Sequence, residues 1–185
     1  MNRETWLMAA TKQLSKRFVA AGLPVVPTDV KVSCGFPGGG SPRKRIGECW
    51  SRKASAGGVN EIFINPTQSD KVQVLAILAH ELCHATDDCA SGHGAPFARL
   101  SRGIGLEGKL TATHAGEDFT AWANKLKLGD FPHEALLPRN KTRSDRSGAR
   151  VKLTCKTTGE SWLVSKTGFQ QLVACPFCED DCHAQ

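Results

Sequence analysis

An apolar run that ends in a histidine–glutamate motif constrains the fold of this chain more than any other feature. In the segment VQVLAILAHELCHA, leucines recur at helical spacing (Leu75, Leu78 and Leu82), and this pattern predicts a helix with one side buried in a core. His80 and His84 lie four residues apart, about 40° around such a helix, so their imidazoles project together. The motif H-E-x-x-H therefore predicts two histidines on a buried helix that can hold one zinc ion.

The residues around this motif supply the other parts of a catalytic zinc site. Glu81 is placed to take a proton from the attacking water, as a general base does. Such a site uses three protein ligands and keeps a fourth position open. His93 is the preferred third ligand, because the glycines of SGHG let the chain reverse and its side chain point back. The alternatives for this position are Asp87, Asp88, Cys89, His114 and Glu117.

The acidic residues after the motif are expected to continue the helix and not to bind the metal. Asp88 falls one turn beyond His84, where a carboxylate can orient an imidazole N–H. A thiolate ligand from Cys89 would add negative charge and weaken the zinc as a Lewis acid. Cys83 is expected to be a small packing residue.

The chain up to about residue 130 predicts an α+β domain. Helices and strands alternate irregularly, and glycines and prolines separate them. The expected helices are 3–21, 67–88, 95–105 and 114–129, and the expected strands are 29–34, 45–52 and 60–66.

The C-terminal cysteines predict a second, smaller unit. Cys175 and Cys178 form a C-x-x-C pair, whereas Cys155 begins a knuckle in which Thr158 stands where the second cysteine is expected. Cys182, or alternatively His183, would complete a structural zinc site. Together with expected strands at 151–155 and 161–165, this predicts a zinc-ribbon-like hairpin. A hairpin without metal is the alternative.

Charge and composition suggest a division of the chain and a class of partner. The net charge is +6, and basic residues are dense at 43–53 and at 139–156. Such segments can follow a phosphate backbone, although a solvated linker has the same composition. We therefore expect a domain at 1–130, a basic linker at 131–150 and the hairpin unit at 151–185, with DNA or another nucleic acid as a partner.

The N-terminus and the lengths of the apolar runs indicate the cellular location to expect. The first residues are charged and lack the apolar core of a signal peptide, and no apolar run approaches the length that spans a bilayer. A cytoplasmic monomer without membrane contact is the expectation.

The stretch HELCHATDDCASGHGAPF resembles the SprT-like zinc metallopeptidases, the group that includes the Spartan DNA–protein crosslink proteases. The shared pattern is H-E-x-x-H, a connection, then H-G-x-x-F, with INP at 64–66 similar to a strand end of that family. The resemblance covers roughly residues 5–130 and is to a compact, bacterial or phage-like member. It implies a zincin-like fold, His80, His84 and His93 as zinc ligands, and Glu81 as general base.

The expected activity is zinc-dependent hydrolysis of peptide bonds, with DNA-associated proteins as the expected substrates. The substrate would lie extended along the strand edge near 60–65, adding main-chain hydrogen bonds to the sheet. The chain has no tyrosine, so a backbone N–H or a histidine such as His114 would have to serve as the oxyanion donor.

Two other functions fit parts of the pattern. One is a non-catalytic nucleic-acid-binding protein whose zinc sites are both structural, but such a site has no need of Glu81 beside its ligands. The other is a metal-dependent amidohydrolase with a small-molecule substrate, which no residue positively supports.

Overall fold

The computed structural model describes residues 1–38, 45–133 and 150–165, together with Gly168, Cys175 and Cys178. The chain separates into two compact units, Met1–Pro138 and Arg139–Gln185. Within the described residues, no helix has both the length and the apolar character needed to cross a membrane.

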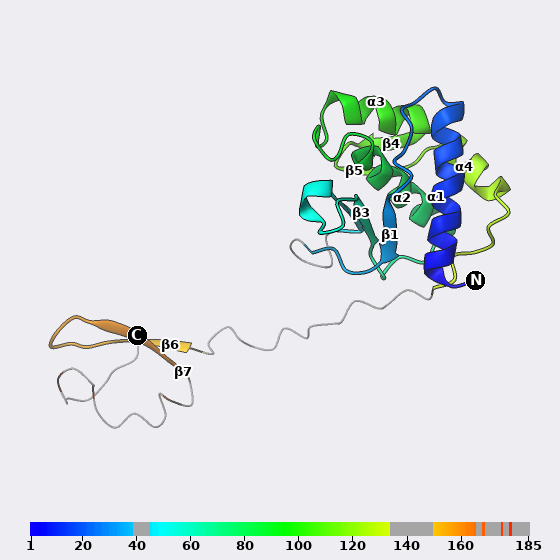
Figure 1. Ribbon diagram of the computed structural model, residues 1–185. Coiled ribbons are helices and arrows are strands. Elements are labelled where there is room, and N and C mark those ends of the chain that lie inside the picture. The colour runs from blue at the N-terminus through cyan, green and yellow to red at the C-terminus, as the bar shows by residue number, and fades with distance from the viewer. Residues whose placement is uncertain (39–44, 134–149, 166–167, 169–174, 176–177, 179–185) are drawn as a thin grey trace. The chain divides into compact units, whose positions relative to one another are not determined.

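The first unit has the expected α+β composition, with four helices, a small mixed sheet and an antiparallel hairpin (Figure 1). Its helices are α1 (Arg3–Ala20), α2 (Lys71–Ala85), α3 (Ala95–Ile104) and α4 (Glu117–Lys125), and a 3₁₀ turn occupies Arg52–Ala54. Its strands are β1 (Lys31–Cys34), β2 (Gly47–Trp50), β3 (Glu61–Ile64), β4 (Leu106–Lys109) and β5 (Ala112–Ala115).

The mixed sheet has β3 at its centre, in the order β1-β3-β2. β1 runs parallel to β3 and β2 runs antiparallel to it. Ile62 and Ile64 alternate along β3 and are fully buried, as the period of a strand requires. Both edges of β3 are thus occupied by neighbouring strands. The expectation that a substrate lies along the edge at 60–65 is wrong, and among the described strands it is β2 that forms the sheet edge near the motif helix.

Helix α2 passes through the core of this unit. Asp70 caps its N-terminus, where the carboxylate accepts a hydrogen bond from the backbone N–H of Gln73 (2.7 Å). The helix packs against α1, α3, α4, β2, β3 and β5, which explains why most of its side chains are buried.

Helix α2 ends at Ala85, three residues before the predicted end. Asp88 and Cys89 have left-handed backbone conformations, with φ of 54° and 64°. Few residues other than glycine adopt this region. The expectation that Asp87 and Asp88 continue the helix is wrong, because the chain turns immediately after Ala85.

The β4–β5 hairpin was not expected from the sequence. Each strand has only four residues, and neither shows a long alternation of apolar side chains. The hairpin also moves the start of the last helix from residue 114 to Glu117, with Gly116 as N-cap. His114 therefore belongs to a strand and not to a helix.

The second unit contains the antiparallel hairpin of β6 (Arg150–Thr154) and β7 (Ser161–Ser165). Its turn is closed by hydrogen bonds from Cys155 N to Glu160 O (2.8 Å) and from Gly159 N to Cys155 O (2.9 Å). Leu153, Cys155 and Cys175 are buried. The predicted hairpin strands at 151–155 and 161–165 are confirmed within one residue.

Strand β2 approaches α2 so closely at Gly47 that there is no room for a side chain. A β-carbon there would lie 2.5 Å from Ile77 Cγ2 and 2.6 Å from Glu81 Oε1. We expect Gly47→Ala to lower the free energy of unfolding by about 1–3 kcal/mol, because either the strand or the helix must shift. Urea unfolding measures this change.

Gly57→Ala is the matched control, since its β-carbon would meet no atom closer than the end of the Lys31 side chain at 3.3 Å. Equal stability changes in the two variants would contradict the close contact between β2 and α2.

Candidate metal centre

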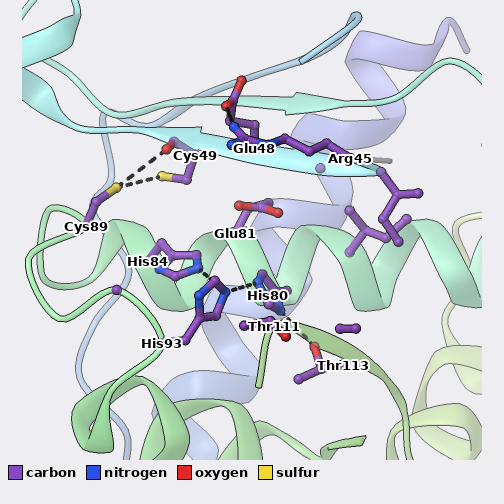
Figure 2. Close-up of a pocket in the computed structure, with 15 residues that line it drawn as sticks. Arg45, Glu48, Cys49, His80, Glu81, His84, Cys89, His93, Thr111 and Thr113 are labelled. Atoms are coloured by element: carbon purple, nitrogen blue, oxygen red, sulfur yellow. Dashed lines mark hydrogen bonds and ion pairs between the residues drawn. The ribbon is translucent and has the colours of Figure 1, made fainter. Parts of the chain in front are cut away.

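Three histidines converge at one end of α2. His80 and His84 project from the helix, and His93 returns to them from the turn before α3 (Figure 2). The Nε2 atom of His93 lies 3.3 Å from Nε2 of His80 and 3.3 Å from Nε2 of His84. One nitrogen from each ring lies within 4.8 Å of the other two, so the group can hold a metal ion.

These distances fit a tetrahedral zinc ion. Ligand nitrogens about 2.0–2.1 Å from such an ion lie about 3.3 Å from one another. A hydrogen bond cannot explain both short distances, because the single Nε2–H of a neutral His93 can donate to only one neighbour. A cation accepting all three lone pairs satisfies the whole group.

Phe97 holds the three rings in place. It is fully buried on α3, and its ring centroid lies 4.7 Å from that of His80, 4.4 Å from that of His84 and 5.0 Å from that of His93. The ring of His84 stacks on it, whereas the other two meet it at steep angles. A rigid aromatic wall of this kind limits the rotamers of all three imidazoles.

Thr113 orients His80 from the opposite side. Its Oγ1 lies 2.8 Å from Nδ1 of His80. When Nδ1–H donates to this hydroxyl, Nε2 carries a lone pair directed at the other histidines. Thr113 lies on β5, which the sequence did not predict, and a single threonine 33 residues from its partner gives no signal in a linear sequence.

Burial keeps two of the histidines in the form that binds metals. Loss of hydration, together with the neighbouring imidazoles, lowers the pKa of His80 to about 3 and that of His84 to about 4. Both rings are therefore neutral at pH 7, which is the protonation state required of a ligand.

Glu81 points away from the histidines' side of the helix toward β2 (Figure 2). Its side chain is 6% exposed. Burial raises its pKa to about 8, with further contributions from Cys89 and Glu48, while a backbone hydrogen bond from Cys49 acts in the opposite direction. A cation at the three imidazoles would favour the ionised carboxylate and so lower this pKa.

A cavity of about 460 Å³ connects the histidines with Glu81. Residues 45–49 form one wall, α2 contributes Ile77 as well as the motif residues, and residues 111–113 form the opposite wall. The edge strand β2 thus flanks the three imidazoles and the carboxyl group in a single cavity.

Asp88, which was expected to orient an imidazole, and its neighbour Asp87 instead shape the turn after α2. Asp88 Oδ1 accepts hydrogen bonds from Arg52 N (2.6 Å) and Asn60 Nδ2 (2.9 Å), and Asp87 Oδ2 accepts one from Ser91 N (3.1 Å). The expectation that Asp88 orients an imidazole is therefore wrong. Its carboxylate instead anchors the turn to the sheet.

The two remote candidates lie outside the cavity. His114 follows Thr113 on β5 and therefore lies on the opposite face of the hairpin, where Nδ1 contacts Ala115 O at 3.1 Å. Glu117 is exposed in the first turn of α4. Neither residue lines the pocket, so His114 is not placed to be an oxyanion donor.

A second group that can hold a metal lies in the C-terminal unit. The sulfur atoms of Cys155, Cys175 and Cys178 all lie within 4.8 Å of one another, with 3.4 Å between Cys155 and Cys178. The backbone N–H of Thr158 donates to Cys155 Sγ (3.3 Å), and hydrogen bonds from Thr158 lower the pKa of Cys155 to about 6. Although Thr158 supplies no thiolate, it thus stabilises the thiolate of Cys155.

Several sequence expectations fall outside the described residues. The fourth ligand of the cysteine site (Cys182 or His183) is one of them. The others are most of the basic linker (134–149) and two residues of the first basic cluster (Arg43 and Lys44).

Removal of the Thr113 hydroxyl should weaken metal binding at the histidines. We expect Thr113→Val to lower zinc affinity about 10–100-fold, because the ring of His80 loses the partner that fixes its tautomer. Competition with a chromophoric chelator measures the affinity. Thr111→Val is the matched control, because Thr111 lines the same cavity without a hydrogen bond to the described histidines. Equal affinities in both variants would refute the orienting role.

The two groups should bind zinc independently. Metal analysis of the purified chain is expected to find two zinc ions per chain, one of which is lost in His84→Ala and the other in Cys175→Ser. A loss of all zinc in His84→Ala would contradict metal binding by the cysteines, and an unchanged content would contradict binding by the histidines.

Comparison of the chain with protein-family models, with curated proteins and with solved structures finds no match.

Proposed function

We propose that this chain is a zinc-dependent metallopeptidase with a zincin-like catalytic domain, similar to the SprT-like family. One observation carries the proposal. The buried carboxyl group of Glu81 shares a cavity with three imidazoles whose separations suit a tetrahedral zinc ion. A structural site needs a closed ligand shell, whereas an open cavity with a carboxyl group beside three ligands suits hydrolysis.

The roles of the residues follow from their positions. His80, His84 and His93 would hold zinc, which when bound supplies Lewis acidity to the scissile carbonyl and the attacking water. Glu81 would accept a proton from that water and deliver it to the leaving amine nitrogen. Phe97 and Thr113 would keep the imidazoles oriented during this exchange.

The edge strand β2 supplies a binding surface for an extended peptide. Among the described strands it pairs only with β3, and residues 45–49 line the cavity. A peptide lying along β2 would gain main-chain hydrogen bonds and pass its backbone over the imidazoles. This surface replaces the β3 edge expected from the sequence, and it favours a peptide over a small amide as the proposed substrate.

A substrate held at DNA is the second element of the proposal. Its support is the net charge of +6 and the basic stretch at 139–156, of which Arg150, Lys152 and Lys156 are exposed in the C-terminal unit. Lysines and arginines in such a stretch can neutralise phosphates without reading sequence.

The decisive variant is Glu81→Gln, assayed with zinc-loaded protein. We expect it to retain two zinc ions per chain and to lose about 10²–10⁴-fold in the rate of cleavage of fluorescently labelled unfolded casein, because the amide cannot accept the proton. Glu117→Gln is the matched control and should cleave at the parent rate, since Glu117 lies outside the cavity.

Cleavage by Glu81→Gln at the parent rate would refute the mechanism. The same assay with histone as substrate, with and without double-stranded DNA and with a chelator, tests the partner. Chelator-sensitive cleavage that DNA stimulates supports a DNA-held substrate. DNA binding without any cleavage supports instead a non-catalytic nucleic-acid-binding protein.

A further inference from the structure

We propose that Cys49 and Cys89 form a dithiol in the wall of the cavity, which peroxide oxidises reversibly to a disulfide. Their sulfur atoms lie 3.6 Å apart, and Cys89 Sγ is also 3.6 Å from the carbonyl oxygen of Cys49 (Figure 2). A disulfide requires about 2.05 Å between the sulfurs, a distance that rotation of the two side chains can reach.

The backbone holds Cys89 opposite Cys49 at an energetic cost. Asp88 and Cys89 are consecutive non-glycine residues with left-handed conformations, and such residues persist only where their surroundings impose them. The surroundings here are the hydrogen bonds from Arg52 N and Asn60 Nδ2 to Asp88, and the one from Cys89 N to His84 O (2.8 Å). The turn is thus fixed in the conformation that directs the thiol at β2.

Access together with pairing distinguishes Cys49 and Cys89 from the other cysteines of the first unit. Cys49 and Cys89 are both half-buried and both line the cavity, so a small oxidant can reach them. Cys83 is 1% exposed, whereas Cys34 is also half-buried but has no second thiol beside it among the described residues. Oxidation of thiols follows exposure as well as thiolate character.

The chemistry requires one equivalent of hydrogen peroxide. The thiolate of one cysteine attacks a peroxide oxygen, so that an S–O bond forms as the O–O bond breaks. The hydroxide released takes up a proton and becomes water. The second thiol then attacks the resulting sulfenic acid, the S–S bond forms, and the S–O bond breaks with loss of water. Both sulfurs are oxidised and both peroxide oxygens are reduced, so two thiols and one peroxide give one disulfide and two water molecules.

The disulfide would join two walls of the same cavity. Cys49 lies on the edge strand beside Gly47, and Cys89 lies in the turn between His84 and His93. The bond would fix the separation of that strand from that turn. This inference does not rest on the proposed function, since it concerns only the two thiols and their access.

The experiment maps disulfides in the full chain. The reduced protein is treated with an equimolar amount of hydrogen peroxide, the free thiols are alkylated, and peptides are analysed by mass spectrometry without reduction. We expect a Cys49–Cys89 linkage at least about tenfold more abundant than any linkage of Cys34 or Cys83. Dithiothreitol should restore both thiols.

Three variants serve as controls. In Cys49→Ser and in Cys89→Ser the remaining thiol lacks its partner, so its sulfenic acid should persist and react with dimedone. Cys34→Ser should form the disulfide to the same extent as the parent.

Absence of the Cys49–Cys89 linkage in the parent chain, or oxidation there that dithiothreitol does not reverse, would overturn the proposal. The parent chain gives the decisive result, so misfolding of a variant cannot hide it. Disulfide mapping needs no peptide hydrolysis, so its outcome and that of the peptidase assay are independent.

Discussion

Burial of α2 on nearly all sides is the constraint on which the rest of the structure depends. Its leucines pack in the core, while the same helix contributes His80, Glu81 and His84 to the cavity. A buried helix resists rotation and translation, because any shift would displace close-packed neighbours in six other elements. The positions of the two histidines and of Glu81 are therefore fixed by the packing of the core. At Gly47 the neighbouring strand β2 leaves no room for a β-carbon beside Ile77 and Glu81.

The turn after α2 brings His93 to the two histidines that the rigid helix holds. The chain must reverse within a few residues for His93 to reach the other imidazoles, and it does so through two left-handed residues. Asp88 binds that turn to Arg52 and Asn60 near the sheet, so the position of His93 depends on contacts far from it in sequence. The acidic residues that follow the motif are thus structural, although their proximity to the histidines suggested a role beside the metal.

The features predicted correctly from the sequence are those that depend on residues close together along the chain. Helical spacing located α2, and the motif with its returning histidine identified three residues that the structure brings within ligand distance of one another. The role of Thr113 and the edge position of β2 were missed because both depend on long-range placement, although the strand at 45–52 itself was expected. Thr113 lies on a strand of only four residues, and β2 and β3 have similar patterns that do not reveal which one has a free edge. The sheet order settles that question through tertiary pairing, which no local window of sequence contains.

The electrostatics of the site favour a cation for a reason beyond ligand geometry. Burial lowers the pKa of His80 and His84 and raises that of Glu81, so that at pH 7 each of these groups tends toward its uncharged form. A divalent cation at the imidazoles adds positive charge to a region of low dielectric constant, where an ionised Glu81 is its natural counter-charge. Cation binding and deprotonation of Glu81 therefore favour each other. In the proposed mechanism, Glu81 therefore becomes an ionised base only once a cation is bound.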